Sequence, residues 1–314
     1  MSGFNVALVN VVLILLYMTP GYALCKLKMV DADHLPTVST LLLYGCSPCM
    51  IISSFLNIEY SLRYLAKMGV FFVVTLAIQS LFMFIIFLIF NKKYEDSRYR
   101  ILTIGSVLGN VGFFGMPLIK EMLPTHPMVI CYSSTYVVSM NVLVFTVGVY
   151  CLTKDKNFIT LKAGIFNPSS MAFMVAIILY LTHAPNWLPD FTQSAIDALG
   201  KMTTPLCMLI LGIRLGKMSI RELFTNWYAY LISFGKLILF PIFSFLCVYL
   251  LPFDMPFKVS VFILSAAPCG SVILNLAEIH KSERELSANI LLLSTLLCVF
   301  SIPLLVLIAD LFFV

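Results

Sequence analysis

Ten apolar stretches divide this chain, and each is long enough to form a membrane-spanning helix. A helix needs about 20 apolar residues to cross the hydrocarbon core of a bilayer. The stretches cover residues 4–25, 36–56, 67–90, 101–120, 127–152, 166–184, 194–215, 226–250, 257–279 and 288–313. Their connections are short and leave no room for a soluble domain. We therefore predict an all-α polytopic membrane protein with ten transmembrane helices.

The composition agrees with this prediction and excludes several other classes. Hydrophobic residues make up 61% of the chain and charged residues 11%, with a mean hydropathy of +1.00. A soluble domain is about half apolar and a quarter charged, so a soluble enzyme, a disordered chain and a nucleic-acid binder are excluded. The net charge of +5 lies in short loops between apolar runs and indicates no nucleic-acid partner. We expect membrane lipid around the chain instead.

Lysine and arginine are divided unevenly between the two sides of the predicted membrane. Loops after the odd-numbered stretches carry 14 of them, loops on the opposite side carry 5, and Lys236 lies within the eighth stretch. Because cytoplasmic loops are enriched in these residues, we expect both termini outside the cytoplasm. The opening residues MSGFNVALVNVV lack a basic segment, so we expect no cleavable signal peptide. The predicted location is the plasma or inner membrane of the cell.

The sequence indicates neither a metal site nor a cofactor. The nine cysteines fall mostly within apolar runs, and the C-x-x-C of Cys46 and Cys49 has no second pair. Small buried thiols explain this usage better than zinc or redox chemistry. No Walker motif is present, which excludes ATP-driven transport by this chain alone. No nucleophile–base constellation indicates an enzyme.

The two halves of the chain resemble each other. YGCSPCMII surrounds Pro48 and KMTTPLCMLI surrounds Pro205, and these prolines are 157 residues apart in a chain of 314. The same offset aligns the glycine-rich part of stretch four with the proline of stretch nine. Five stretches per half is an odd number, so the repeat over 153–314 would be inverted relative to 1–152. Such inverted repeats are typical of secondary transporters, although membrane helices also share prolines and small residues by chance.

Stretches four and nine contain the strongest helix breakers. Residues 109–117 read GNVGFFGMP, and residues 265–272 read SAAPCGSV. A broken helix exposes backbone N–H groups, which suit an anion at the start of a half-helix. The candidate binding residues here are Asn110, Gly115, Pro117, Pro268, Ser271 and Asn275. A close glycine-lined crossing and a simple proline kink are the alternatives, whereas two breaks that face each other would form a polar site.

Three further polar residues lie within apolar stretches. Asn141 and Gln79 must face protein or a cavity, as helix–helix contacts or as ligand contacts. Lys236 could pair with a substrate carboxylate, replace a bound cation or extend to the membrane interface. No Asp or Glu lies at mid-depth in stretches three, four, five, eight or nine. This absence favours an anionic or neutral solute.

Four short segments, specific only in combination, carry a resemblance to a known family. They are Asn110 with Gly115-Met116-Pro117, LGKMTTPL at 199–206 with Leu211-Gly212, Pro268 with Ala277, and LLSTLL at 292–297 with Ile302-Pro303-Leu304. Together they resemble the auxin efflux carrier family, in the bacterial branch that includes malate and malonate permeases. The plant PIN-formed auxin carriers are related to this branch. The resemblance covers essentially the whole chain.

The resemblance implies a 5+5 inverted-repeat fold of the bile-acid-symporter type, with broken helices four and nine crossing. Helices 1, 2, 6 and 7 would form a scaffold and a homodimer interface, and helices 3–5 and 8–10 a bundle that moves like an elevator. By position, Asn110, Pro117 and Pro268 mark the crossover and Asn141 a substrate contact. Plant members have an Asp–Lys pair in helix three, where this chain has Gln79. Many bacterial relatives have Asn at Val272, for which Ser271 or Asn275 could substitute.

We therefore expect a secondary carrier or facilitator of a small organic anion, such as a dicarboxylate or an auxin-like acid. The carboxylate would meet Asn110 and half-helix N–H groups, while hydroxyls of Ser47, Thr203 or Thr204 close the site from the scaffold. The sequence leaves open whether H+ or Na+ is coupled. A cation-coupled bile-acid-like symporter and a non-transporting membrane sensor are the two alternative functions. Na+ dependence would identify the first, and ligand binding without flux the second.

Overall fold

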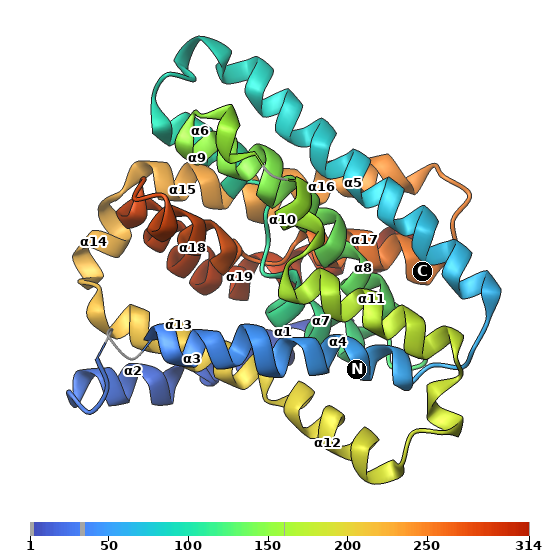
Figure 1. Ribbon diagram of the computed structural model, residues 1–314. Coiled ribbons are helices and arrows are strands. Elements are labelled where there is room, and N and C mark those ends of the chain that lie inside the picture. Colours follow the sequence, from blue (N-terminus) through green and yellow to red (C-terminus); the bar gives the residue numbers. More distant parts are fainter. Residues whose placement is uncertain (1–2, 32–34, 160, 314) are drawn as a thin grey trace.

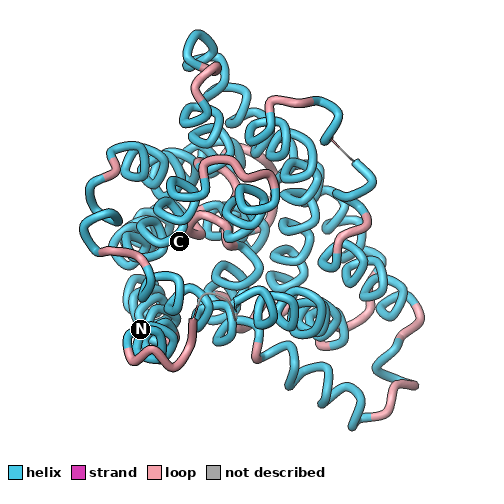
Figure 2. The backbone as a smooth tube through the Cα atoms, turned by 60° about the vertical axis from the view of Figure 1, so that its left-hand side comes forward, coloured by secondary structure: helices cyan, strands magenta, loops and turns pink. Residues whose placement is uncertain are grey.

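The chain folds almost entirely into helices. The computed structural model describes residues 3–31, 35–159 and 161–313, and within them helices are joined by short loops (Figure 2). The first half contains α1 (Gly3–Leu16), α2 (Met18–Lys26), α3 (Leu35–Leu41), α4 (Ser47–Leu56), α5 (Leu62–Phe90), α6 (Ser97–Gly105), α7 (Met116–Met122), α8 (Met128–Leu143) and α9 (Val149–Thr153). The second half contains α10 (Leu161–Ile165), α11 (Pro168–Leu181), α12 (Asp190–Lys201), α13 (Thr203–Lys217), α14 (Ile220–Thr225), α15 (Trp227–Phe234), α16 (Phe240–Tyr249), α17 (Met255–Ser265), α18 (Ser271–Ile279) and α19 (Arg284–Phe313).

Eight helical segments of the described chain are long and apolar enough to cross a membrane. They are Gly3–Lys26, Leu35–Leu56, Leu62–Lys93, Met128–Thr153, Lys156–Leu181, Asp190–Lys217, Trp227–Tyr249 and Arg284–Leu311. These coincide with eight of the ten predicted stretches. The other two stretches, 101–120 and 257–279, are interrupted at 106–110 and 266–270. The two interruptions lie in the segments that the glycine and proline pattern predicts to break.

Other prolines widen their helices by one turn without ending them. A π-helical turn ends two residues before each of Pro48, Pro117 and Pro241, as η2 (Leu42–Cys46), η4 (Val111–Gly115) and η8 (Gly235–Leu239). Proline lacks an N–H donor and its ring crowds the carbonyl of the preceding turn, which the wider π turn relieves. A fourth π turn, η5 (Val144–Gly148), has no proline after it, and α19 continues through Pro303. Proline alone therefore does not explain the two interruptions.

The helices fall into two groups in the view of Figure 1. α2, α3, α4, α12 and α13 lie in the lower part, and α5, α6, α9, α15 and α16 lie in the upper part. Within the lower group α13 packs along α2, and α4 packs against α12 and α11. Within the upper group α5 packs on α8, and α15 packs on α19. α1 joins the groups, because it contacts α13 as well as α7 and α19.

Glycines bring α2 and α13 into direct backbone contact. A Cβ at Gly21 would overlap the carbonyl oxygen of Leu209, and one at Gly212 would overlap that of Met18. A Cβ at Gly216 would lie 2.7 Å from the Cβ of Cys25. Small residues are what allow membrane helices to approach this closely. We call the contact around Gly21, Gly212 and Gly216 the α2–α13 seam.

Polar side chains lie inside the molecule, while large apolar side chains face outward. Gln79 and Lys236 are fully buried, whereas Val73, Phe84 and Leu88 on α5 are at least half exposed. In water the buried polar groups and exposed apolar groups would both be unfavourable. Hydrocarbon around the helices removes the second penalty, so this distribution agrees with a multi-pass membrane protein.

Candidate functional site at the helix crossover

The two interrupted segments meet in the interior of the molecule. Gly109 and Cys269 form an antiparallel β-bridge between them. The N–H of Asn110 donates to the carbonyl of Pro268 at 2.7 Å, and the N–H of Gly270 donates to the carbonyl of Leu108 at 3.0 Å. We call this pair of segments, 108–110 and 268–270, the crossover. It satisfies four backbone groups that the broken helices would otherwise leave unpaired in an apolar interior.

The local sequence explains why the chain leaves the helical path here. Asn110 has φ −80° and ψ 56°, outside the helical region, and its carbonyl accepts the N–H groups of Phe114 and Gly115 to start the next turn. Gly270 has φ −79° and ψ 139° and begins α18. A Cβ at Gly270 would lie 2.9 Å from the carbonyl oxygen of Gly109, so the crossover needs glycine at this position.

The Asn110 side chain is the poorly satisfied group of the crossover. It is only 4% exposed, and its buried Nδ2 makes no well-formed hydrogen bond among the described residues; the group it interacts with is the thiol of Cys207 on α13. A thiol is a weak acceptor, so the amide N–H keeps most of its capacity to donate. An amide N–H can donate to a carboxylate or to a carbonyl oxygen. The crossover therefore presents a donor that a ligand acceptor would satisfy.

A cleft of about 840 Å³ lies between α1, α4, α12 and α13 on one wall and α7 and α8 on the other; Met116 and Pro117, which follow the first break, line it, whereas the residues of the crossover do not. Two predicted binding residues, Pro117 and Thr204, line it, and so do Lys120, Asp197 and Lys201. Its remaining polar lining is Asn10, Tyr17, Ser53, Ser54, Asn57, Glu121 and His126. The cleft borders the connections 57–61 and 123–127, which the charge distribution predicts to be extracytoplasmic. We call it the outer cleft.

Asp197 joins two helices on one wall of the outer cleft. It accepts a hydrogen bond from the Ser53 hydroxyl at 2.9 Å and pairs with Lys201 at 2.5 Å. Ser53 lies on α4, which holds Pro48, and Asp197 lies on α12, which precedes α13 and its Pro205. Gly200 makes the same junction close, because its Cβ would lie 2.9 Å from the Cα of Met50.

The opposite side of the crossover is tied by an ion pair. Arg214 near the end of α13 donates to Glu278 near the end of α18 at 2.7 Å. Ser271 and Asn275 lie on α18 before this pair, and both are half-buried. Neither lines the outer cleft. The two sides of the crossover thus differ: one is open as a cleft, and the other is joined by a salt bridge.

Comparison with known proteins identifies the family. The family model described as "Membrane transport protein" matches the chain twice, over residues 6–157 and 152–306. The chain belongs to this family, the auxin efflux carrier family. A relative from Methanocaldococcus jannaschii, described as an uncharacterized transporter, is 23% identical over 295 residues, which cover 91% of this chain and 93% of the relative. The two-part match supports the internal repeat, and the prediction that this is a transporter and not an enzyme is confirmed.

Within this transporter the predicted site residues separate into groups. Asn110 and Pro268 form the crossover itself, and Gly115 packs beside it, with its Cβ position 3.2 Å from Leu264 of α17. Pro117 and Thr204 line the outer cleft. Ser47 is buried at the start of α4, and Thr203 is buried with its hydroxyl unpartnered among the described residues.

Asn141 and Lys236 have partners of their own. The Nδ2 of Asn141 donates to Asn167 at 3.1 Å, and Asn167 caps the start of α11. The side chain of Asn141, which the resemblance implies to contact the substrate, therefore already makes a hydrogen bond within the protein. Lys236 is fully buried and donates to the carbonyl of Ser265 at 2.7 Å; it does not line the outer cleft.

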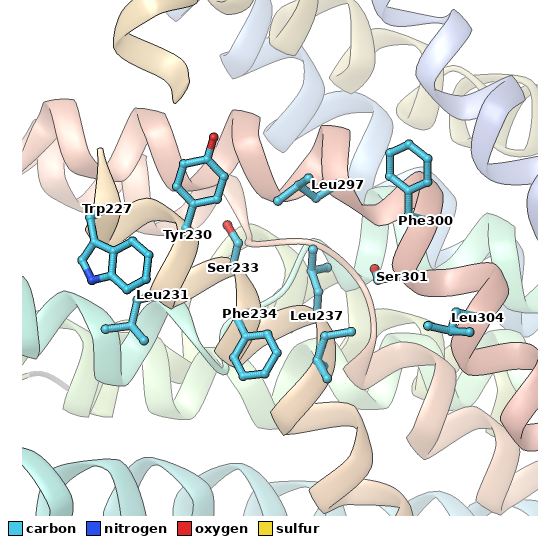
Figure 3. A pocket seen from close by; sticks show the side chains of 11 residues that line it. Trp227, Tyr230, Leu231, Ser233, Phe234, Leu237, Leu297, Phe300, Ser301 and Leu304 are labelled. Atoms are coloured by element: carbon cyan, nitrogen blue, oxygen red, sulfur yellow. The ribbon is translucent and has the colours of Figure 1, made fainter. Parts of the chain in front are cut away.

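A second hollow, of about 510 Å³, lies between α15, η8 and α19. Trp227 lies at one end and Phe300 and Leu304 at the other (Figure 3). Its lining is apolar apart from the hydroxyls of Tyr230, Ser233 and Ser301. A carboxylate would lose hydration here without gaining a charged or amide partner. The outer cleft and crossover are therefore the better candidate for a polar ligand.

Sequence reasoning missed two residues that shape this region. The Ser294 hydroxyl accepts the N–H of Cys269 at 3.0 Å and so fixes the second break from α19. A serine in a long apolar run gives no spacing signal for such a contact. Asp197, in contrast, is followed four residues later by Lys201, a pattern that predicts an ion pair on one helix face.

Proposed function

We propose that this transporter is a secondary carrier or facilitator of a small organic anion, such as a dicarboxylate or an auxin-like carboxylate. The observation that carries the proposal is the buried Nδ2 of Asn110 at the point where two interrupted helices meet, a donor whose only recorded contact among the described residues is the weak acceptor Cys207. A carboxylate oxygen would satisfy it. Backbone N–H groups at the start of the following half-helix would add to the attraction for negative charge.

The outer cleft carries charges of both signs. Lys120 and Lys201 line it together with Glu121 and Asp197, and Lys201 is paired with Asp197. The cleft lining therefore does not by itself select an anion, and the proposal rests on the crossover. The hydroxyl of Thr204 faces the same cleft and Thr203 is its neighbour, so both remain candidates to close over the ligand from α13. The predicted contacts of Ser47, Ser271 and Asn275 with the ligand remain predictions.

We propose that the chain crosses the plasma or inner membrane ten times as a 5+5 inverted repeat, with both termini extracytoplasmic. Within the described residues, eight helical segments long enough to span the membrane and two interrupted ones support this count. Helices 1, 2, 6 and 7 would form the scaffold and helices 3–5 and 8–10 the bundle that moves. The outer cleft and the Arg214–Glu278 pair then describe an arrangement open outward and joined inward. A homodimer through this scaffold is what the family resemblance implies.

Exchange of labelled carboxylates in proteoliposomes tests the proposal. We expect saturable counterflow of one acid by the wild type and a loss of about tenfold or more in Asn110→Ala, since a hydrogen bond to a charged group contributes about 1.5–3 kcal/mol. Asn289→Ala is the matched control. Asn289 is also a buried amide, but its Nδ2 already donates to the carbonyl of Glu222 at 3.0 Å.

The outcomes separate the alternatives. Counterflow lost in Asn110→Ala and retained in Asn289→Ala, with both proteins eluting as folded oligomers, would support the crossover as the binding site. Unimpaired counterflow in Asn110→Ala would contradict it. Wild-type protein that binds a carboxylate without moving it would favour a non-transporting sensor.

A further inference from the structure

A positive charge lies buried behind the crossover. Lys236, on η8, is fully buried, and its Nζ donates to the carbonyl of Ser265 at 2.7 Å. The ring of Phe240 lies 4.7 Å from the same nitrogen. Within the described residues no carboxylate forms an ion pair with Lys236; the ion pairs found involve other lysines and arginines. The charge therefore depends on backbone dipoles and an aromatic face.

The ammonium group lies beside the place where both interrupted segments meet. The position that a Cβ on Gly109 would occupy is 2.9 Å from Nζ of Lys236, and the same position is 3.3 Å from the carbonyl oxygen of Ala267. Gly109 belongs to the first break and Ala267 to the second. Ser265, the acceptor, is the last residue of α17. Nζ of Lys236 thus lies between the backbone of the first break and the C-terminal carbonyls of α17, the half-helix that precedes the second break.

This environment is the kind that receives a small cation. Carbonyls at the end of a helix carry partial negative charge and stabilise a cation. In transporters with broken helices, unwound carbonyls and half-helix C-terminal ends are where Na+ is coordinated. A buried ammonium without such partners would be strongly unfavourable. Lys236 therefore fills, from inside the chain, a place with the chemistry of a cation site.

We propose that the Lys236 ammonium is a built-in substitute for a coupling cation, giving the crossover a positive charge that balances the transported anion. The inference rests on the proposed function for the identity of the anion, but not for the cation-like role of Lys236. Two consequences follow. Exchange should not require Na+, and removal of the lysine should leave a vacancy that a small external cation can fill.

The first test measures thermal unfolding of the purified full-length protein and needs no substrate. Lys236→Ala should unfold at a lower temperature than wild type, and propylammonium at millimolar concentration should restore stability. Propanol, which has the same carbon chain without the charge, should not. Lys258→Ala is the matched control, because Lys258 also donates to a backbone carbonyl, that of Tyr249 at 2.9 Å, but at the exposed end of α17. Equal stabilisation of both variants, or none of Lys236→Ala, would overturn the proposal.

The second test measures carboxylate exchange with Na+ present and with Na+ replaced by choline. Wild type should exchange equally in both, and Lys236→Met, which keeps length without charge, should lose about tenfold or more. A wild type that requires Na+, or a Lys236→Met variant with normal exchange, would overturn the proposal. If Lys236→Met does not fold, the Na+ comparison on wild type still decides.

The two tests separate this inference from the proposed function. Wild type that exchanges no carboxylate, together with propylammonium rescue of Lys236→Ala, would remove the anion-carrier proposal and leave the cation-like role of Lys236 in place. Exchange that depends on Asn110 but not on Lys236 would support the anion-carrier proposal and remove the cation-like role of Lys236.

Discussion

The crossover and the α2–α13 seam are two places where backbones approach closely, and they do so by different means. At the seam, intact helices meet through Gly21, Gly212 and Gly216, with no hydrogen bond between them among those described. At the crossover, helices are interrupted and their backbones exchange two hydrogen bonds. At the seam the backbone N–H and C=O groups stay hydrogen-bonded within their own helices, whereas at the crossover some of these groups are released from helical hydrogen bonding.

This difference indicates which region can hold a ligand. A contact between intact helices is dry and depends on shape alone, so it suits a part that stays fixed. Interrupted backbone at membrane depth is tolerated only where protein or a cavity satisfies it. The crossover bonds to itself, and the amide donor of Asn110 makes no well-formed hydrogen bond among the described residues. Variants that add a single methyl group to either region should therefore fail in different ways.

The largest effect is expected at the seam. In Gly212→Ala the new Cβ would overlap the Met18 carbonyl oxygen, so α2 and α13 must separate. Overpacking of this kind typically costs 1–3 kcal/mol, and because the obstacle is backbone we expect about 3 kcal/mol off the free energy of unfolding. Thermal unfolding in detergent measures it. Gly45→Ala is the control, since a Cβ there meets nothing within 4 Å. A normal unfolding temperature for Gly212→Ala would show that the seam is looser than described.

An intermediate effect on stability is expected at the crossover. The loss of carboxylate exchange should be more pronounced there than the loss of stability. Gly270→Ala places a Cβ 2.9 Å from the Gly109 carbonyl oxygen and should displace the bridge, at a cost of about 1–3 kcal/mol. We expect exchange to fall about tenfold, because Asn110 bonds to the same segment through Pro268. Gly112→Ala is the matched variant, with its nearest neighbour at an ordinary 3.5 Å. Loss of exchange in Gly112→Ala and not in Gly270→Ala would contradict the assignment.

Much of this fold follows from local sequence, because each span is specified by its own residues. Hydropathy predicts the continuous helices, and the glycine and proline pattern predicts which two stretches break. The partners of the polar residues do not follow, because they depend on tertiary packing. Asn141 bonds to Asn167, a residue that no motif connects to it.

Gln79 and Lys236 show the same limit more sharply. They are 157 residues apart, the same offset as Pro48 and Pro205, so the repeat relates them. Both are fully buried, yet Gln79 donates to Ser139 and to the carbonyl of Thr75, whereas Lys236 donates to the end of α17. The repeat predicts a polar residue at each position, and only the packing shows that one of them reaches the crossover.

The smallest effect on stability is expected where the two regions are joined, at the Arg214–Glu278 pair between α13 and α18. Its side chains are 17% and 45% exposed, and partly exposed pairs contribute about 1 kcal/mol or less. Glu278→Gln should therefore unfold almost like wild type. The substitution should instead change how accessible the crossover is from the cytoplasmic side. The ion pair joins α18, which follows the crossover, to α13, which forms the seam.

Labelling of Ser271→Cys measures that access, because Ser271 is half-buried at the start of α18. The half-buried thiols Cys49 and Cys247 would first be replaced, which leaves the other seven cysteines buried. A membrane-impermeant thiol reagent applied from the predicted cytoplasmic side should then react several-fold faster when Glu278→Gln is added. Lys201→Gln, which breaks the Asp197 pair in the outer cleft, is the control and should leave this rate unchanged. Equal rates with and without Glu278→Gln would mean that packing, and not the ion pair, closes this side of the crossover.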